Sequence, residues 1–507
     1  MSELALFRMC FPEAFISDVL IPETNRQIEG EKMDLQEFYV YLGCHFFMAC
    51  FEGISDRRAW WSKQDVSMFD GAPFRLGGFM SFNRFKAIAK AMTYTNKPVP
   101  TTFEDRFHEV RQMLTRFNEH YEADYCPSWM NTLDESVNSF TDQNCPGFMC
   151  IPRKPHPFGN EYHSIADGDG GKPIMWRIKL QEGKDRPKKP DGSFAFATEF
   201  ERAGFTKTAS LMLFMTKNIH HTGKIVTMDS GFCVKVGIEA MDKYGVYGQA
   251  LIKKKRYWPR GVPGDQIDEH FNNKALGYSE TLKQVADGKQ FLIHCTKEEK
   301  YVTKLMSTHG LINEVPDHTT YRYVNGEWVS FKYTEPISRH NNAKHWVDDV
   351  NNRRHAPIGL EDVWATKWWP DRQFTFICSV AEVNAVMSQA RGRNDIAEQT
   401  LKFRRRLAQQ MLENKIIDTG QSPCSPATLR KCKRLDGALL HTLETRKTFT
   451  GKWDSRNGTW TKVKSKYLKS QCKTCKFECR TYCSCQREVT MCTKCWADHK
   501  SVCSNTS

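Results

Sequence analysis

The C-terminal end of the chain carries thiol and imidazole side chains at the short spacings that metal sites use. Eight of the 19 cysteines lie after residue 471. Zinc takes four thiolate or imidazole ligands in a tetrahedron, and a C-x-x-C turn brings two thiolates to one ion. The expected zinc ligands are Cys472, Cys475, Cys483, Cys485, Cys492, Cys495, His499 and Cys503.

These eight ligands suffice for two structural Zn²⁺ ions. If the first pair joins the third and the second joins the fourth, the result is a cross-brace like that of RING or PHD modules. The segment has too little apolar content for a conventional core, so metal binding would supply its folding energy. Cys479 is a ninth candidate that could replace a neighbour or stay free. The alternative is a disulfide knot of the secreted type.

The excess positive charge of the chain, +14, is concentrated beside this cysteine module. Residues 429–480 hold 15 Lys or Arg against four Asp or Glu, a net charge of +11. Such a stretch favours a polyanionic partner, because neutralised phosphates release counterions. A solvated basic linker is the alternative. Elsewhere, Lys254 and Arg256 precede Tyr257 and Trp258, which suits phosphate contact with base stacking, although a solvated loop explains them equally well.

Helices must form the first part of the chain, to about residue 128. Apolar residues recur there at helical spacing, as in Leu35, Phe38, Leu42 and Phe46. The longest apolar run, 38–51, spans 14 residues, below the ~18 to 20 that a transmembrane helix needs. We therefore expect a buried core helix at this position.

Short apolar or alternating runs, broken by Gly, Pro and Asn, begin at Trp129 and predict strands. They read MNTLDESVNSF, EYHSIADGDGG, IMWRIKL, ASLMLFMT and KIVTMDSGF. A helix over 234–244 and a strand over 246–252 follow, so Asp229 would end a strand in a βαβ-like unit. That is where α/β folds place functional side chains. Helices return over 343–412.

Length and composition bound the remaining possibilities. A chain of 507 residues predicts two to four domains at ~100 to 200 residues each. A mean hydropathy of −0.58 with 26% charged residues excludes a polytopic membrane protein and a largely disordered chain. The N-terminus lacks the pattern of a secretory signal. We therefore expect an intracellular protein, in which disulfides are rare.

Three stretches resemble landmarks of the piggyBac transposases. The family's DE followed by I-P-x-K-P-x-x-x-G is matched by LDE and then by Ile151, Pro152, Lys154, Pro155 and Gly159. Its apolar strand ending in Asp is matched by KIVTMD, and its Y-N-x-x-K-G-G-V-D and N-R-W-P segments by HNNAKHWVDDVNNRRHAP and TKWWPDR. With weaker echoes such as MSFNRF and the cysteine-rich end, the resemblance extends from about Phe11 to Cys503.

The resemblance implies a DDD-type DNA transposase that cuts and pastes through hairpin ends into a TTAA target. Its catalytic and metal-binding aspartates correspond to Asp134, Asp229 and Asp348, which would hold two Mg²⁺ ions, with Mn²⁺ as a substitute. The partner would be double-stranded DNA, bound by a homodimer in the nucleus, without a membrane. Arg353, Arg354 and Lys367, which flank the third aspartate, are expected to line the DNA channel with Lys254 and Arg256.

The fold implied is α/β, with an RNase H-like catalytic core, a mainly β insertion, helical flanking regions and the zinc-bound cross-brace. The expected boundaries are a helical dimerisation and DNA-binding region at 1–129, the core at 130–240 and 335–355, the insertion at 241–334, a second helical part at 356–418, a basic linker at 419–470 and the zinc domain at 471–507.

Some positions depart from the family pattern. His345-Trp346 replaces Gly-Gly before the third aspartate, Asn351 replaces an acidic residue, and Ser230-Gly231 replaces Asn-Trp. The chain also begins without an acidic N-terminal tail. These departures leave open a domesticated, catalytically impaired DNA-binding protein of the same family. A RING- or PHD-type ubiquitin ligase or chromatin reader would explain only the cysteine module.

Overall fold

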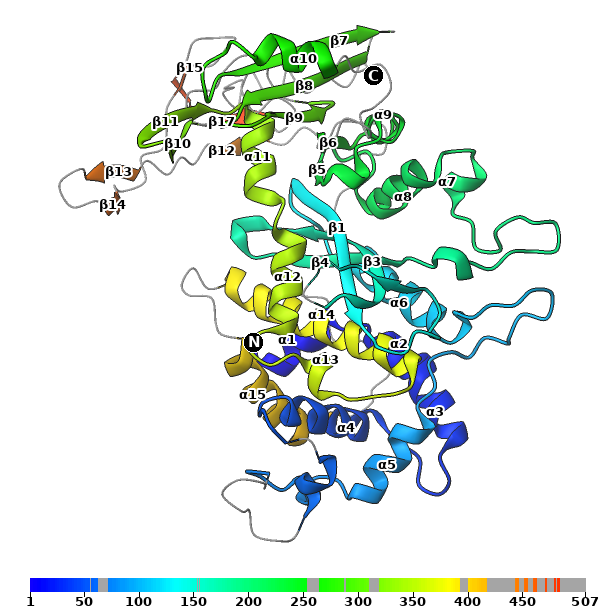
Figure 1. Cartoon of the computed structure of the whole chain (residues 1–507). Coiled ribbons are helices and arrows are strands. Elements are labelled where there is room, and N and C mark those ends of the chain that lie inside the picture. The colour runs from blue at the N-terminus through cyan, green and yellow to red at the C-terminus, as the bar shows by residue number, and fades with distance from the viewer. Residues whose placement is uncertain are drawn as a thin grey trace. The chain divides into compact units, whose positions relative to one another are not determined.

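Figure 1 shows the chain as a computed structural model. The structure describes residues 1–54, 56–62, 72–152, 154, 156–252, 264–286, 289–309, 319–392 and 400–416, and short backbone segments between 443 and 483. The chain divides into two compact units, Met1–Cys432 and Lys433–Ser507. Among the described helices, none combines the length and the apolar character required to cross a membrane.

Helices from both ends of the first unit pack together, as the blue and yellow ribbons of Figure 1 show. The early helices are α1 (Glu3–Cys10), α2 (Glu13–Phe15), α3 (Ile21–Gln27), α4 (Leu35–Met48), α5 (Phe82–Ala91) and α6 (His108–Asp124). The late helices are α13 (Leu360–Val363), α14 (Trp369–Gly392) and α15 (Thr400–Leu412). The expected helical beginning of the chain is confirmed. The late helices pack against it, α14 on α1 and α15 on α4.

Helix α4 is the core helix expected from the longest apolar run. It begins after Asp34, whose carboxylate accepts a hydrogen bond from the Glu37 N–H at 2.7 Å. Most of its apolar residues are buried, and Phe38, Leu42 and Phe46 have no solvent exposure. A Cβ at Gly43 would lie 2.8 Å from the Met411 Cβ, so the glycine permits the close approach of α15.

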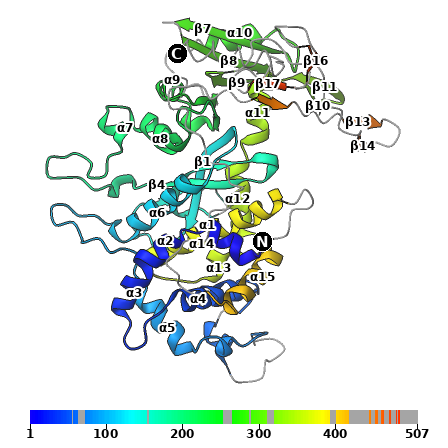
Figure 2. The ribbon, with the colours of Figure 1, turned by 180° about the vertical axis from the view of Figure 1, so that it is seen from behind.

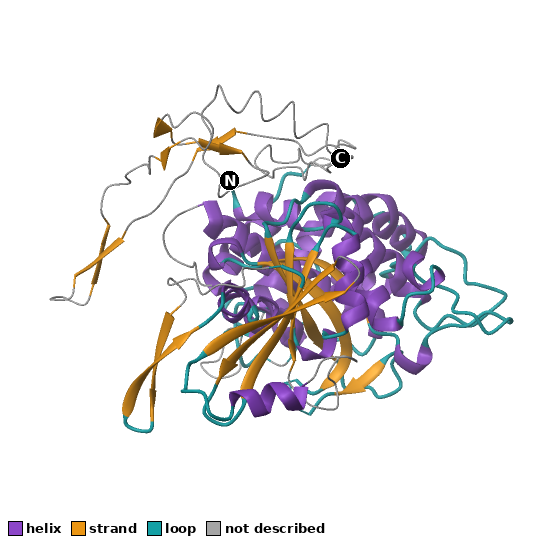
Figure 3. Cartoon of the chain, turned by 90° about the horizontal axis from the view of Figure 1, so that it is seen from above, coloured by secondary structure: helices purple, strands orange, loops and turns teal. Residues whose placement is uncertain are grey.

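A mixed sheet of nine strands lies beside these helices (Figure 3). Its strands are β1 (Met130–Ser139), β2 (Phe148–Cys150), β3 (Phe158–Asp167), β4 (Ile174–Leu180), β5 (Ile225–Met228), β6 (Tyr247–Ile252), β7 (Ser279–Ala286), β8 (Lys289–Lys297) and β9 (Val302–Ser307). The order is β2-β3-β1-β5-β6-β9-β8-β7, with β4 paired to β3. Strand β5 is parallel to both β1 and β6, and the other pairs are antiparallel.

The remaining elements of the first unit connect or cover this sheet. They are α7 (Glu199–Arg202), α8 (Lys207–Thr216), α9 (Lys235–Lys243), α10 (Gly264–Phe271), α11 (Glu335–Ala343), α12 (Trp346–His355) and the hairpin of β10 (Thr319–Val324) and β11 (Glu327–Lys332). Helix α12 packs on β1, and α6 and α14 pack on β4, an arrangement also visible from behind (Figure 2). The βαβ-like unit expected around Asp229 is confirmed as β5, α9 and β6.

Single-turn helical segments join these elements. They are η1 (Ile16–Leu20, a π-helical turn), η2 (Arg57–Trp61), η3 (Leu76–Gly78), η4 (Asp169–Gly171), η5 (Gly183–Asp185), η6 (Lys217–Ile219) and η7 (Ser230–Phe232). The last of them begins directly after Asp229, so it turns the chain away from the end of β5.

One predicted strand is wrong: the run ASLMLFMT lies in helix α8. Met212, Leu213 and Met215 are all buried, and α8 packs on α9. A helix with apolar residues on most of its surface has no clear period in sequence, so its pattern resembles that of a buried strand.

The second unit is described only as short paired strands. They pair β12 (Leu443–Thr445) with β17 (Thr481–Cys483), β13 (Gly451–Asp454) with β14 (Thr459–Lys462) and β15 (Ser470–Gln471) with β16 (Glu478–Cys479). Apart from the backbone of Cys483 in β17, the expected zinc ligands lie outside the described residues.

Candidate active site

Asp134 lies within β1, in a partly buried position. Its carboxylate Oδ1 accepts a hydrogen bond from the Glu135 N–H at 2.8 Å. Burial raises the pKa of Asp134 to about 7, and the negative charge of Asp348 adds to this shift, whereas the Lys154 ammonium opposes it. Two carboxylates close enough to influence each other's charge are a site for a cation.

The parallel pairing of β1 and β5 places Asp229 beside Asp134. Leu133 pairs with Met228, so each aspartate follows a paired position on adjacent strands. Neighbouring strands lie ~4.8 Å apart, and residues in register point to the same face. The strand-end position expected for Asp229 is therefore confirmed, because it follows the last ladder pair, as Asp134 does on β1.

Helix α11 covers the strand end at Asp229. The Thr227 hydroxyl and His340 Nδ1 are hydrogen-bonded at 2.8 Å, and the Thr132 hydroxyl donates to the Ala343 carbonyl at 2.7 Å. Burial lowers the pKa of His340 to about 4, and the charge of Asp229 opposes this shift. These contacts fix the end of α11 over β1 and β5, and with it the start of α12.

Asp348 lies in the first turn of α12, where a negative charge interacts favourably with the helix dipole. Its side chain is 46% exposed, and its Oδ1 lies 3.6 Å from the Lys154 Nζ. The Lys154 ammonium also donates to the Glu135 carbonyl at 3.3 Å. Asp348 therefore faces β1 from the helix, across from Asp134, with a cation beside it.

The departures from the family pattern have structural roles on α12. Trp346 lies against Gly168, where an added Cβ would collide with the indole ring, so the glycine leaves room for the bulky side chain. Asn351 donates to the Glu135 carbonyl at 3.4 Å and accepts from Arg354 Nη1 at 2.9 Å. Asn351 thus attaches α12 to β1.

The basic residues expected to contact DNA have different environments. Lys367 is exposed and Arg353 is half-buried. Lys254 and Arg256 lie outside the described residues. Arg354 contradicts the expectation: its side chain is fully buried, and it forms a two-pronged ion pair with Glu361 at 2.6 to 2.8 Å. A guanidinium held in this way is not available to a phosphate.

An arginine of helix α15, in the run KFRRRL, is buried in a similar way. Phe403 and Leu407 pack inward, and Arg404 beside them is also buried. Its guanidinium is satisfied inside the protein by Glu382 at 2.7 Å and by backbone carbonyls.

Composition and spacing do not give Lys154 a functional role. Its position in the I-P-x-K-P match is the sequence feature that points to one. The structure adds the reason: Lys154 is the cation next to Asp348 and the backbone of β1.

Fold and site together place the chain among mixed α/β proteins with clustered carboxylates that suit a divalent cation. A family model described as Transposase IS4 matches residues 2–386. The chain therefore belongs to this family of transposases, the piggyBac type. Transposases of this family generally use divalent metal ions.

Among solved structures, the chain is similar to one described as a piggyBac transposase synaptic complex with hairpin DNA, determined by electron cryo-microscopy. The TM-score is 0.59 at 16% sequence identity, and the match covers 97% of each chain. At this identity the likeness establishes a shared fold. The comparison with curated proteins gives no significant match.

Proposed function

We propose that the chain cleaves and joins DNA strands as a cut-and-paste transposase, through hairpin ends and into TTAA targets. The proposal rests on three carboxylates carried by neighbouring elements. Asp134 of β1 and Asp348 of α12 influence each other's charge, and Asp229 directly follows β5, the strand paired with β1. We further propose that strands β4-β3-β1-β5-β6 form an RNase H-like core, because β1 lies at the centre of this order and has β5 parallel to it.

The donor set fits Mg²⁺, which takes oxygen ligands and keeps several waters. The raised pKa of Asp134 reflects a buried carboxylate whose charge Lys154 compensates only in part, and a bound cation would supply the remaining compensation. Asp134, Asp229 and Asp348 would hold two Mg²⁺ ions, with Mn²⁺ as a substitute, and the ions would supply charge stabilisation to a phosphoryl transfer. The chain's own residues would position these carboxylates, with Lys154 orienting Asp348.

The partner we propose is double-stranded DNA, bound by a homodimer in the nucleus. Two observations support it: the solved structure that shares this fold is a synaptic complex with hairpin DNA, and the basic stretch at 429–480 is suited to a polyanion. Lys367 and Arg353 are the described residues proposed to contact the phosphate backbone. Lys254, Arg256 and a C-terminal domain with two structural Zn²⁺ remain part of the proposal outside the described residues.

We propose that the functional regions of the chain have the boundaries expected from sequence. Residues 1–129 and 356–418 form the dimerisation and DNA-binding part, 130–240 and 335–355 the catalytic core, and 241–334 the insertion. Residues 419–470 form a basic linker to the zinc domain at 471–507. The packing of α1 on α14 and of α15 on α4 joins residues 1–129 to residues 356–418 and supports this grouping.

The test of the proposal is a cleavage assay with the full chain, Mg²⁺ and a duplex that carries the inverted repeats and TTAA flanks of its own element. Mg²⁺-dependent nicks at the repeat ends, followed by hairpins, are the expected products. Specific binding of the same duplex without any nick in Mg²⁺ or Mn²⁺ would overturn the catalytic proposal and favour the domesticated binding protein.

The pKa of Asp134 predicts a particular dependence of stability on pH. Its folded-state pKa of about 7 lies above the ordinary value of about 3.9, so folding favours the protonated form. The contribution of this group to stability is therefore lost as the pH rises between these two values. Without metal, Asp134→Asn should raise the melting temperature relative to wild type at about pH 8, and the difference should shrink towards about pH 4.

Differential scanning calorimetry of wild type and Asp134→Asn across this pH range measures the effect. Added Mg²⁺ should stabilise the wild type more at about pH 8 than at about pH 6, since binding competes with the proton. Asp349→Asn is the matched control, because it removes a neighbouring carboxylate and should leave the pH dependence of the melting temperature unchanged. Melting curves of wild type and Asp134→Asn that stay parallel across the range would contradict the prediction.

A further inference from the structure

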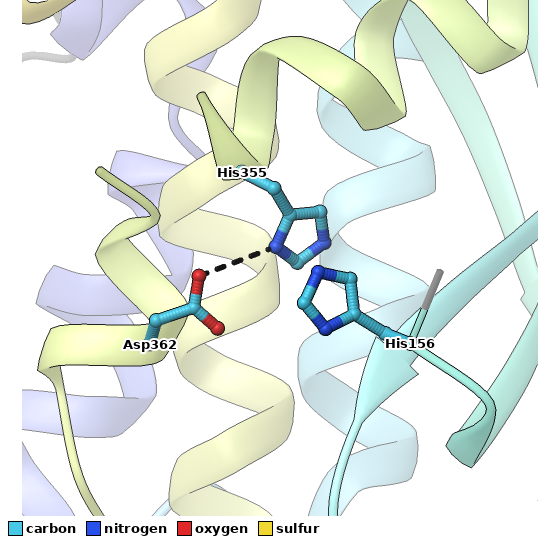
Figure 4. A group of neighbouring side chains, drawn as sticks. All are labelled: His156, His355 and Asp362. Carbon is cyan, nitrogen blue, oxygen red and sulfur yellow. Dashed lines mark ion pairs between the residues drawn. The ribbon is translucent and has the colours of Figure 1, made fainter. Parts of the chain in front are cut away.

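Two histidines and an aspartate converge on the side of α12 away from its start (Figure 4). His156 lies in the loop between β2 and β3, His355 is the last residue of α12, and Asp362 lies in α13. One ligand atom from each residue lies within 4.8 Å of the other two. Three separate segments therefore present imidazole and carboxylate donors to one point.

Within this cluster, a buried nitrogen of His355 lies within ion-pair distance of the Asp362 carboxylate but forms no hydrogen bond. This nitrogen, Nδ1, is inaccessible to solvent. It lies 3.6 Å from Asp362 Oδ2, which is beyond the usual 2.7 to 3.2 Å of a hydrogen bond. Two ligands on a tetrahedral zinc ion, at ~2.0 to 2.1 Å from the metal, are separated by ~3.3 Å. The observed gap of 3.6 Å is longer than a hydrogen bond and somewhat wider than the separation of two ligands of one ion.

The His156 and His355 rings stack with their centroids 4.3 Å apart, so one ring would have to turn before a nitrogen of each could face one ion. The Asp362 side chain is 46% exposed, which leaves an entry path for an ion. The Asp362 carboxylate lies directly against Gly359, where an added Cβ would collide with it. Binding of one ion would therefore require the exposed Asp362 carboxylate and one imidazole ring to move.

We propose that His156, His355 and Asp362 form a Zn²⁺ site with water as the fourth ligand, separate from the three-aspartate site. Imidazole nitrogen suits Zn²⁺ and similar transition metals, whereas Mg²⁺ takes oxygen ligands. The mixed donor set therefore selects a different metal from the carboxylates at the other end of α12.

The position of this site gives the ion a structural role. His156 is two residues from Lys154, the cation beside Asp348, and His355 ends the helix whose first turn holds Asp348. An ion bound to both histidines joins the Lys154 loop to α12 at a second point. It thereby holds the helix that carries Asp348 in register with β1.

The test measures zinc bound to the full chain after dialysis, by mass spectrometry of the metal. Because the C-terminal module is itself proposed to bind zinc, the informative quantity is the difference between variants. His355→Gln and Asp362→Asn should each lose about one zinc ion per chain relative to wild type. His108→Gln, a change at a histidine on α6 outside the cluster, should lose none. Equal zinc content in all four proteins would overturn the proposal.

A second measurement needs no variant, so it does not depend on the folding of a mutant. Diethyl pyrocarbonate modifies accessible, unligated histidines, and peptide mass spectrometry locates the modified residues. With Zn²⁺ present, His156 and His355 should be protected, and removal of the metal by a chelator should make them reactive while His108 stays unchanged. Equal modification of His156 with and without Zn²⁺ would overturn the proposal.

Discussion

Asp134→Asn, Asp229→Asn and Asp348→Asn should each lower Mg²⁺-dependent cleavage of end DNA by at least about 10³-fold. A metal ion contributes several kcal/mol of charge stabilisation in phosphoryl transfer, and about 1.4 kcal/mol corresponds to tenfold in rate. Asparagine keeps the shape of the side chain and one oxygen but removes the charge that holds the metal. Asp134 on β1 and Asp348 on α12 influence each other's charge, and Asp229 directly follows the paired strand β5, so the loss of any one of these charges should weaken metal binding.

Single-turnover cleavage of a labelled end duplex measures these rates, with binding of the same duplex followed by gel shift. Binding should persist, because the basic residues are unchanged. The control is Asp349→Asn, which alters the neighbouring residue of the same helical turn and should cleave within about threefold of wild type. Cleavage within about tenfold of wild type by any of the three variants would remove that aspartate from the catalytic set.

Arg354→Ala should destabilise the protein by about 3 to 5 kcal/mol, since removal of one partner leaves a buried charge uncompensated. Both side chains of the Arg354–Glu361 pair have no solvent exposure. The guanidinium also donates to the Val137 carbonyl at 3.2 Å and to Asn351 at 2.9 Å. The substitution therefore releases α12 from β1 and from α13 together.

Urea unfolding followed by tryptophan fluorescence measures this loss. Arg353→Ala is the matched control: its position is adjacent on α12 and half-buried, and its effect on stability should stay within about 0.5 kcal/mol. The double variant Arg354→Met with Glu361→Leu removes both charges and should recover part of the loss. A stable Arg354→Ala protein with weakened DNA binding would instead support the phosphate contact expected from sequence.

Local apolar pattern was sufficient for the short buried strand at 225–228, for the helix after it and for the core helix α4. Pattern failed for α8, whose apolar residues cover most of its surface and hide the period. The family motifs brought Asp134, Asp229 and Asp348 to attention, whereas composition and spacing alone did not distinguish them from surface carboxylates.

The sequence by itself determined the membership of the family, the element types over most of the first unit and the strand-end position of Asp229. The tertiary structure alone decided which charged residues are exposed. Arg354 and Arg404 look like surface cations in sequence, but Glu361 and Glu382 neutralise them inside the core. Only the tertiary structure places the His156 ring against the His355 ring. The reason is physical: a side chain's partner lies in another element, and only the packing of those elements determines whether a charge or an imidazole faces water, an ion or a buried neighbour.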